Sequence, residues 1–286
     1  MTPDAWRAKG DVFDWRGERI FFRAAGRGEP VVLIHGFPTA SWDWAPLWPA
    51  LVERYRVLVL DMIGFGFSAK PRDFAYSIFA QADLVGALLA REQVTRYHLV
   101  AHDYGLTVAQ ELLARQRDGA AAPRITSVCL LNGGMFPEAH RPLVTQKLLA
   151  SPLGPLVARF SSYRMFARAM RGIWGRHPVS DAELGAMWQL VTAHDGLRVM
   201  PELIGYLAER RRHRERWVGA LVGATVPVRF IAGLVDPISG AHMVARYREL
   251  VSNPDVVELA GVGHYPQLEA PGDVERALLD QLARAA

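Results

Sequence analysis

The fold is decided by one short stretch of the chain, which has the sequence LVAHDYGL at residues 99–106. The strand-forming residues before Asp103 are followed, after it, by apolar residues at helical spacing. Ala101 and Gly105 lie two positions before and after Asp103, where a sharp strand-turn-helix corner has no room for larger side chains. The stretch therefore predicts a nucleophile elbow, with aspartate at the corner where serine is usual.

Strand-like and helix-like segments alternate on both sides of this corner. The pattern predicts an opening hairpin within residues 12–23 and buried strands near 30–35, 56–61, 125–131, 226–232 and 256–259, with helices between most of them. Such alternation is typical of an α/β protein with a mostly parallel sheet flanked by helices. Residues 133–224 carry helix-compatible segments and no convincing strand. We therefore expect an α/β core at 1–132 and 225–286, with a helical cap at 133–224.

Composition bounds the class of protein. The 286 residues are half apolar, which is enough for one large domain with an inserted subdomain. The net charge of +4, with acidic residues interspersed, does not indicate a nucleic-acid partner or stable membrane insertion. No apolar run reaches the roughly 18 residues of a membrane span. The single cysteine, Cys129, is expected in a buried strand and suits a reducing compartment, so we expect a cytoplasmic protein.

Three residues with catalytic side chains follow three of the expected strands. Asp103 follows the elbow strand, Asp236 follows the strand near 226–232, and His264 follows the last strand. Each alone is an ordinary turn or loop residue, but their order is that of an α/β-hydrolase triad: nucleophile, acid, histidine. The carboxyl ends of parallel strands meet at one edge of a sheet, so the three side chains can converge. The joint arrangement predicts a catalytic triad.

These features resemble the α/β-hydrolase superfamily over nearly the whole chain. The resemblance includes HGFP at 35–38 and DMIGFGFS at 61–68, besides the elbow, Asp236 and His264. The elbow sequence HDYG is similar to the branch with aspartate nucleophiles, the epoxide hydrolases and haloalkane dehalogenases. Longer segments resemble the mesoderm-specific transcript protein family, namely HGFPT at 35–39, NGGMFPE at 132–138, RWVGAL at 216–221 and HYPQLE at 264–269. The resemblance fixes no substrate.

An aspartate nucleophile favours attack on sp³ carbon. A carboxylate can open an epoxide or displace a halide and form an alkyl ester on Asp103. His264, oriented by Asp236, would then activate the water that hydrolyses the ester. The resemblance implies that the backbone N–H groups of Phe37 and Tyr104 form the oxyanion hole. The histidines show no metal-binding cluster, and neither metal nor cofactor is expected.

The leaving group separates the candidate reactions. An epoxide oxygen needs a proton donor, and the resemblance implies a cap tyrosine, Tyr206, with Tyr163 as a poorer match. Dehalogenases that resemble this chain usually carry tryptophan and asparagine where it has Tyr104 and Phe37. Epoxide opening is therefore preferred. The alternatives are a haloalkane dehalogenase or an esterase with the same triad, and a non-catalytic protein that binds a ligand or partner.

The substrate pocket is expected between cap and core. Phe37, Tyr104, Trp174 and Trp188 are expected to line it and to enclose a small apolar substrate. The arginine-rich run at 210–216 is interpreted as the solvated end of a helix. The sequence indicates neither the oligomeric state nor which epoxide is the substrate.

Overall fold

A computed structural model describes residues 1–119 and 123–285. Eight strands form one sheet in the order β1-β2-β4-β3-β5-β6-β7-β8. The first two strands pair antiparallel with each other, β2 pairs antiparallel with β4, and all the remaining pairs are parallel. The strands are β1 (Asp11–Trp15), β2 (Glu18–Ala25), β3 (Pro30–Ile34), β4 (Arg56–Leu60), β5 (Arg96–His102), β6 (Arg124–Leu131), β7 (Val228–Gly233) and β8 (Asp255–Leu259). The predicted α/β class with a mostly parallel sheet is confirmed.

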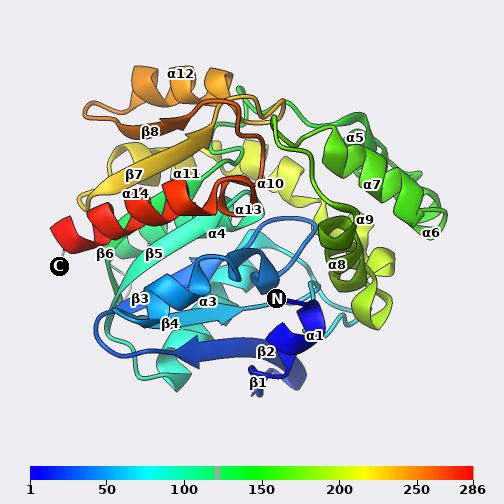
Figure 1. The fold of residues 1–286 in the computed structure, drawn as a ribbon, viewed down its shortest axis with the longest axis horizontal. Helices are drawn as coiled ribbons and strands as arrows, with labels where there is room; N and C mark the ends of the chain where they lie inside the picture. Colours follow the sequence, from blue (N-terminus) through cyan, green and yellow to red (C-terminus); the bar gives the residue numbers. More distant parts are fainter. Residues whose placement is uncertain (120–122, 286) are drawn as a thin grey trace.

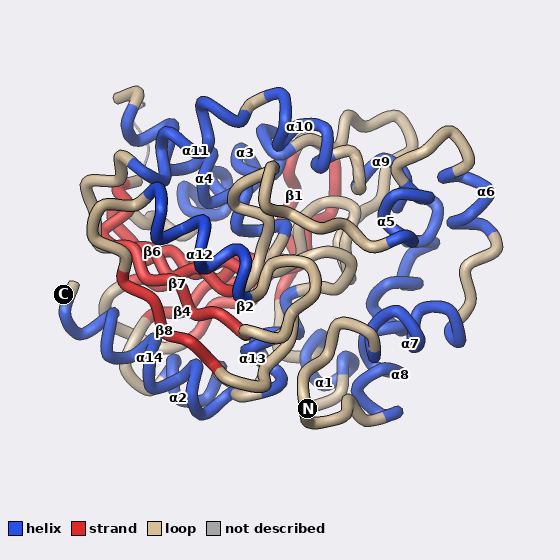
Figure 2. Tube along the Cα trace, turned by 90° about the horizontal axis from the view of Figure 1, so that it is seen from above, coloured by secondary structure: helices blue, strands red, loops and turns tan. Residues whose placement is uncertain are grey.

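Helices cover both faces of this sheet (Figures 1 and 2). Those outside the β6–β7 connection are α1 (Pro3–Arg7), η1 (Ser41–Trp44), α2 (Trp48–Val52), α3 (Ile78–Arg91), α4 (Tyr104–Arg117), α12 (Ala241–Leu250), α13 (Pro266–Glu269) and α14 (Pro271–Arg284). In Figure 2, α3, α4 and α12 lie on one side of the strands, and α2 and α14 lie on the other.

The central strands are buried on both faces because their side chains alternate between two apolar cores. On β3, Val32 and Ile34 belong to the core under α3 and α4, whereas Val31 and Leu33 belong to the core under α2 and α14. Cys129 on β6 belongs to the second core and is buried, and burial raises the pKa of its thiol. A parallel sheet covered in this way leaves the carboxyl ends of its strands as the place for polar chemistry.

The connection between β6 and β7, residues 132–227, is fully described and holds helices and no strand. We call it the helical insertion. Its helices are α5 (Val144–Leu149), α6 (Gly154–Arg159), α7 (Tyr163–Arg171), α8 (Asp181–Thr192), η2 (Ala193–Val199), α9 (Met200–Leu203), α10 (Tyr206–Arg212) and α11 (Arg214–Val222). None of the helices in the described ranges is long and apolar enough to cross a membrane.

The helical insertion has two parts. Helices α5 to α9 form one end of the molecule in both views, whereas α11 packs against α4 in the helix layer that covers the sheet (Figures 1 and 2). Trp217 of α11 is buried there and donates its indole N–H to Glu111 of α4, at 2.8 Å. The division of the chain into a core and a cap at residues 133–224 stays a prediction, and α11 is the part of that range that packs with the core helices.

Candidate active site

The corner after β5 has the strained geometry expected of an elbow. Asp103 has φ 45° and ψ −103°, a backbone conformation that non-glycine residues rarely adopt. A Cβ added to Gly105 would lie 2.6 Å from the backbone oxygen of His35, and one added to Gly36 would lie 2.9 Å from Cβ of Asp103. Glycine is therefore required at position 105 of the corner and at position 36 of the neighbouring loop.

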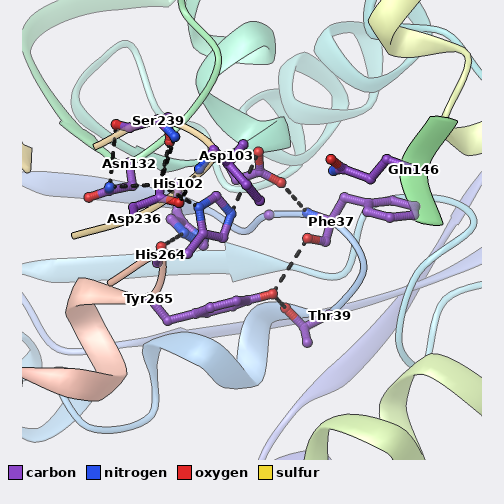
Figure 3. A network of polar contacts seen from close by, with 12 residues as sticks. Phe37, Thr39, His102, Asp103, Asn132, Gln146, Asp236, Ser239, His264 and Tyr265 are labelled. Carbon is purple, nitrogen blue, oxygen red and sulfur yellow. Dashed lines mark hydrogen bonds and ion pairs between the residues drawn. The ribbon is translucent and has the colours of Figure 1, made fainter. Parts of the chain in front are cut away.

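Asp103, Asp236 and His264 meet at the carboxyl ends of their strands. Figure 3 shows the His264 ring between the two carboxylates. Its Nδ1 lies 2.8 Å from Oδ2 of Asp236, and its Nε2 lies 3.9 Å from Oδ1 of Asp103. All three side chains are buried. The structure therefore brings together the three residues predicted as a triad, and their catalytic roles stay a prediction.

The acid member is fixed by further hydrogen bonds. Oδ2 of Asp236 accepts from the amide of Asn132 at 2.9 Å and from the hydroxyl of Ser239 at 2.6 Å. Its Oδ1 accepts from the backbone N–H of Ile238 at 2.8 Å. Burial alone would raise the pKa of the Asp236 carboxyl, but the positive charge of His264 and these donors hold that pKa well below its usual range. Asp236 is therefore a permanent anion at neutral pH.

That anion determines the charge of the histidine. Burial alone would lower the pKa of His264, but the charge and hydrogen bond of Asp236, together with the charge of Asp103, raise it to about 9. A pKa of about 9 keeps the proton on His264 at neutral pH. Removal of the charge on Asp103, for example by ester formation, removes one of the causes that raise this pKa.

The backbone N–H of Phe37, one of the two predicted oxyanion-hole donors, points at the carboxylate. It donates to Oδ2 of Asp103 at 3.1 Å. Tyr104, which carries the other predicted donor, begins α4 directly after the corner. The loop of Phe37 is tied down by the hydroxyl of Tyr265, which lies 3.4 Å from the Phe37 carbonyl and 3.3 Å from the Thr39 hydroxyl (Figure 3). One of the two predicted donors therefore contacts Oδ2 of Asp103, and the assignment of an oxyanion hole stays a prediction.

The two candidate tyrosines lie in different environments. Tyr206 is buried, with its ring centre 4.9 Å from that of Tyr104 and 6.2 Å from that of Phe37. Its hydroxyl has no hydrogen-bond partner among the described residues. Burial and the negative charge of Asp103 raise the pKa of this hydroxyl, so it stays protonated.

Tyr163 does not reach the site. Its side chain is on the surface of α7, with its ring against Trp188, and its hydroxyl lies 3.5 Å from the carbonyl of Asp181. The expectation that Tyr163 shares the catalytic role of Tyr206 is therefore not supported. The physical reason is the orientation of α7, which turns its first residue toward solvent.

A cavity of about 130 Å³ lies between the helical insertion and the Phe37 loop. Phe37, Trp188 and His264 line it, and most of its other lining residues are apolar side chains from α5 to α9. Tyr104 and Trp174, two residues expected to line the pocket, are not among its lining residues. Trp174 instead stacks on Tyr265, with ring centres 5.5 Å apart, and supports the loop from behind.

One polar side chain of the cavity was missed by the sequence analysis. Gln146 of α5 is buried and lines the cavity, and Figure 3 shows its amide on the same side of Asp103 as Phe37. Its oxygen accepts from the backbone N–H of Leu143 at 2.9 Å and so closes the first turn of α5. A glutamine three residues after a helix cap is a capping signal in sequence, which gives no indication of a pocket.

Arg210 is the second residue that sequence reasoning missed. It is 2% exposed, although the run at 210–216 was expected to be a solvated helix end. Its Nε donates to the hydroxyl of Thr107 at 2.6 Å, and one terminal nitrogen donates to the Asp103 carbonyl at 3.0 Å and lies 4.0 Å from Asp103 Oδ1. The guanidinium also lies over the ring of Tyr206, 4.4 Å from its centre. One arginine of the run is thus a component of the site.

Of the other arginines of this run, Arg211 and Arg212 are exposed as expected, whereas Arg214 and Arg216 are half-buried in ion pairs. Arg214 pairs with Glu138 at 2.6 Å, and Arg216 pairs with Glu111 and Asp118 at 2.7 and 2.5 Å. The signal that could have identified Arg210 is its spacing from Tyr206. Residues four apart share one face of a helix, so a buried Tyr206 brings Arg210 to the same interior. Within the described ranges, no group of three or more His, Cys, Asp or Glu side chains is arranged to hold a metal ion.

The comparison with known proteins agrees with the fold. The family model of the alpha/beta hydrolase fold matches residues 29–271. The chain therefore belongs to the α/β-hydrolase fold family, as its sequence predicted. It is 42% identical over 280 residues to the human mesoderm-specific transcript homolog protein, and the match covers 93% of this chain and 84% of that protein. The predicted resemblance to that family is confirmed.

Other relatives carry names of enzymes. The chain is 38% identical over 279 residues to LipZ of Mycobacterium tuberculosis, named as a hydrolase, with 97% of this chain and 96% of that protein covered. It is 32% identical over 311 residues to epoxide hydrolase A of the same organism, with 95% and 96% covered. The protein is therefore an α/β hydrolase with epoxide hydrolases among its relatives.

Two solved structures share the fold. One is the epoxide hydrolase CorEH, with a TM-score of 0.80, 19% identity, and 97% of this chain and 99% of that chain covered. The other is the haloalkane dehalogenase DbeA from Bradyrhizobium elkani, with a TM-score of 0.79, 23% identity, and 96% and 98% covered. At these identities the likeness concerns the fold alone.

Proposed function

We propose that the protein is a hydrolase that opens an epoxide to a diol through an alkyl ester on Asp103. The observation that carries the proposal is the Tyr206 hydroxyl, which is buried without a hydrogen-bond partner among the described residues and whose pKa is raised by burial and by the charge of Asp103. A buried polar group without a partner is costly, and at an enzyme site it is commonly reserved for the substrate. A phenol near a carboxylate nucleophile suits an epoxide oxygen, which must gain a proton as its bond to carbon breaks.

The first step is the opening of the ring. Oδ1 of Asp103 is the attacking oxygen, because Oδ2 is held by the Phe37 N–H at 3.1 Å. The new bond joins Oδ1 to one epoxide carbon while the bond from that carbon to the epoxide oxygen breaks. The electron pair moves to the oxygen, which takes the proton of Tyr206. The guanidinium of Arg210, stacked over that ring, stabilises the phenolate that remains.

The second step hydrolyses the ester. Esterification removes the charge of Asp103, so the pKa of His264 falls below its resting value of about 9 and the neutral imidazole becomes accessible at neutral pH. His264 takes a proton from water, and the hydroxide attacks the ester carbonyl. The oxyanion forms on Oδ2, where the Phe37 N–H already lies. Collapse expels the diol oxygen, which takes the proton from His264, and leaves Asp103 as a carboxylic acid. The proton of that acid passes through solvent to the Tyr206 phenolate, and His264 takes back from solvent the proton that it released before the step.

Single turnover in ¹⁸O-water with a generic aryl epoxide tests this sequence of steps. Attack on the ester carbonyl puts the heavy oxygen into the Asp103 carboxylate, and the first diol carries none, whereas direct attack of water labels the diol at once. The His264→Ala variant is expected to accumulate the ester on Asp103, detected by peptide mass. The matched control is His177→Ala, an exposed histidine in the helical insertion.

The panel of substrates also tests the alternatives. Haloalkanes and simple esters are offered beside epoxides, since dehalogenases share the fold and the Gln146 amide supplies an N–H near the site. Halide release without diol formation would assign the site to a dehalogenase, and acyl products would assign it to an esterase. If no substrate of the panel yields a product or an adduct, the site belongs to a non-catalytic binding protein and the proposal is wrong.

A further inference from the structure

The segment from residue 139 to residue 180 has an unusual charge. It contains seven arginine or lysine residues and no aspartate or glutamate, so its charge of +7 exceeds the +4 of the whole chain. The seven are Arg141, Lys147, Arg159, Arg164, Arg168, Arg171 and Arg176, and all of them are exposed. Arg171 pairs with Asp181, and the other six form no ion pair with any residue that the structure describes. Their charges face solvent without compensation.

The same segment exposes large apolar side chains. Of the eleven exposed large apolar residues in the described chain, seven lie here: Val144, Leu148, Leu153, Leu156, Phe160, Tyr163 and Met165. Leu156 belongs to α6, and Leu153 and Phe160 are the residues directly before and after this helix. Phe160 is 67% exposed and Leu156 is 55% exposed. Exposed apolar side chains gathered in this way indicate an interaction surface.

Most of these residues belong to three short helices or directly flank them. Helices α5, α6 and α7 form one end of the molecule, away from the sheet, in both views (Figures 1 and 2). The three helices are short, and each carries basic and apolar residues side by side. We call this end, with the exposed basic and apolar residues just named, the basic apolar face.

We propose that the basic apolar face docks onto the surface of an anionic lipid bilayer. Arginine and lysine next to apolar side chains are the composition of interfacial helices, which seat apolar groups below the lipid phosphates and basic groups among them. None of the three helices is long enough to span a bilayer, so the contact is superficial. A second copy of the chain is a poorer partner for this face, because two such faces would oppose charges of the same sign.

The docking surface is continuous with the cavity of the candidate site. Helices α5 and α7 supply cavity-lining residues, and Met165 of α7 both lines the cavity and is 49% exposed. A docked molecule would thus hold the cavity at the bilayer surface. In a step that rests on the proposed function, the substrate class is an apolar epoxide dissolved in the lipid, which enters between these helices without crossing water.

Vesicle sedimentation with the full chain tests the docking. The protein is mixed with vesicles of phosphatidylcholine alone or with phosphatidylglycerol in equal amount, at low and high salt. We expect binding to the anionic vesicles at low salt that is at least about tenfold stronger than binding to neutral vesicles, and that weakens as salt is added. The R159E/R164E/R168E and L153S/L156S/F160S variants are each expected to lose at least about tenfold in partitioning.

Matched controls carry the same changes elsewhere on the surface. R27E/R54E/R72E reverses three exposed arginines outside the segment, and V12S/V222S removes exposed valines. Both are expected to bind vesicles like the wild type. Thermal melting of every variant separates misfolding from loss of binding. If a variant melts early, its partitioning is not used, and the single variant F160S is measured in its place.

Three results would overturn the proposal. They are equal binding to neutral and anionic vesicles, wild-type binding by both variants of the basic apolar face, and concentration-dependent dimers in sedimentation velocity that F160S abolishes without any vesicle binding by the wild type. Vesicle binding is measured without turnover. Its failure therefore leaves the proposed epoxide opening untouched, and failure of epoxide opening leaves the docking result untouched.

Discussion

Helices α7 and α10 of the helical insertion have similar composition and opposite environments. Each begins with a tyrosine and carries three arginines, at residues 164, 168 and 171 on α7 and at 210–212 on α10. On α10, Tyr206 is buried against the rings of Tyr104 and Phe37, and Arg210 is buried against Asp103. On α7, Tyr163 and the arginines face solvent. The difference lies in what each helix packs on: α10 meets the N-terminal end of α4 at the corner, and α7 lies at the free end of the molecule.

The comparison teaches that burial decides what a tyrosine or an arginine does. A phenol in water has water as its partner and is chemically idle, whereas a buried phenol without a partner keeps its proton for a substrate. An arginine in water is available to a charged surface, whereas a buried arginine is committed to the groups around it. The following tests compare mutations of buried residues with mutations of exposed ones, one residue at a time.

The largest effect is expected from the tyrosines. Tyr206→Phe removes the proton donor of the proposed ring opening and is expected to lower kcat for an epoxide by about 10²-fold or more. Tyr163→Phe, the matched change on α7, is expected to leave kcat unchanged. Stopped-flow measurement of ester formation locates the loss in the first step, and equal kcat values for the two variants would contradict the assignment.

Mutations of the two sets of arginines are expected to change the free energy of unfolding by different amounts. Arg210→Met removes a buried cation that binds the Asp103 carbonyl and the Thr107 hydroxyl, and is expected to cost about 3 kcal/mol in the free energy of unfolding. Arg168→Met on α7 is expected to change that free energy by less than about 0.5 kcal/mol. Urea denaturation measures both free energies. If Arg168→Met destabilises the protein as much as Arg210→Met does, the exposure of an arginine does not indicate its contribution to stability.

The buried His264 is expected to make the stability of the protein depend on pH. His264 has a pKa raised to about 9 in the folded protein, so its contribution to stability is complete below the unfolded value near 6.5 and is lost as the pH rises through 9. The stability difference between wild type and His264→Gln should therefore shrink by on the order of 2 kcal/mol between pH 6 and pH 10. His177→Gln, the same change at an exposed position, is the matched control.

The smallest effect is expected from the ion pairs of Glu138 at the surface, one of which is made with the first residue of α11. Glu138 pairs with Arg214 and Arg246 at the surface, and these partners lower its pKa to about 2. Because the pair is partly exposed, Glu138→Gln is expected to cost less than about 1 kcal/mol at neutral pH. The cost should fall further in high salt, and a larger value, insensitive to salt, would show that this ion pair behaves like a buried one.

The fold could be predicted because its signals are local. Apolar strands that alternate with helical spacing determine the α/β class, and the small residues at 101 and 105 locate the corner at Asp103. The convergence of Asp103, Asp236 and His264 followed from topology, since parallel strands end at one edge. Tyr206 was found through the resemblance to epoxide hydrolases.

The rest of the site depends on tertiary packing. Arg210 belongs to a run of arginines that the sequence presents as solvated, and only the seating of α10 on α4 buries one of them. Trp174 is large and apolar like Trp188, but it stacks on Tyr265 behind the Phe37 loop, whereas Trp188 faces the cavity. The side on which a short helix buries its residues is set by its neighbours, and short helices give little periodicity to reveal it.

The position of the helical insertion has a consequence for how such enzymes diversify. The residues proposed to make and hydrolyse the ester come from loops at the edge of the sheet, whereas Tyr206 and most of the cavity wall come from residues 132–227, a single uninterrupted stretch of chain. One recombination event at each end of that stretch would exchange most of the cavity wall together with Tyr206, and also Asn132 and Arg210, which hold Asp236 and Asp103. The same two junctions are natural points at which to build chimeras between this protein and its relatives.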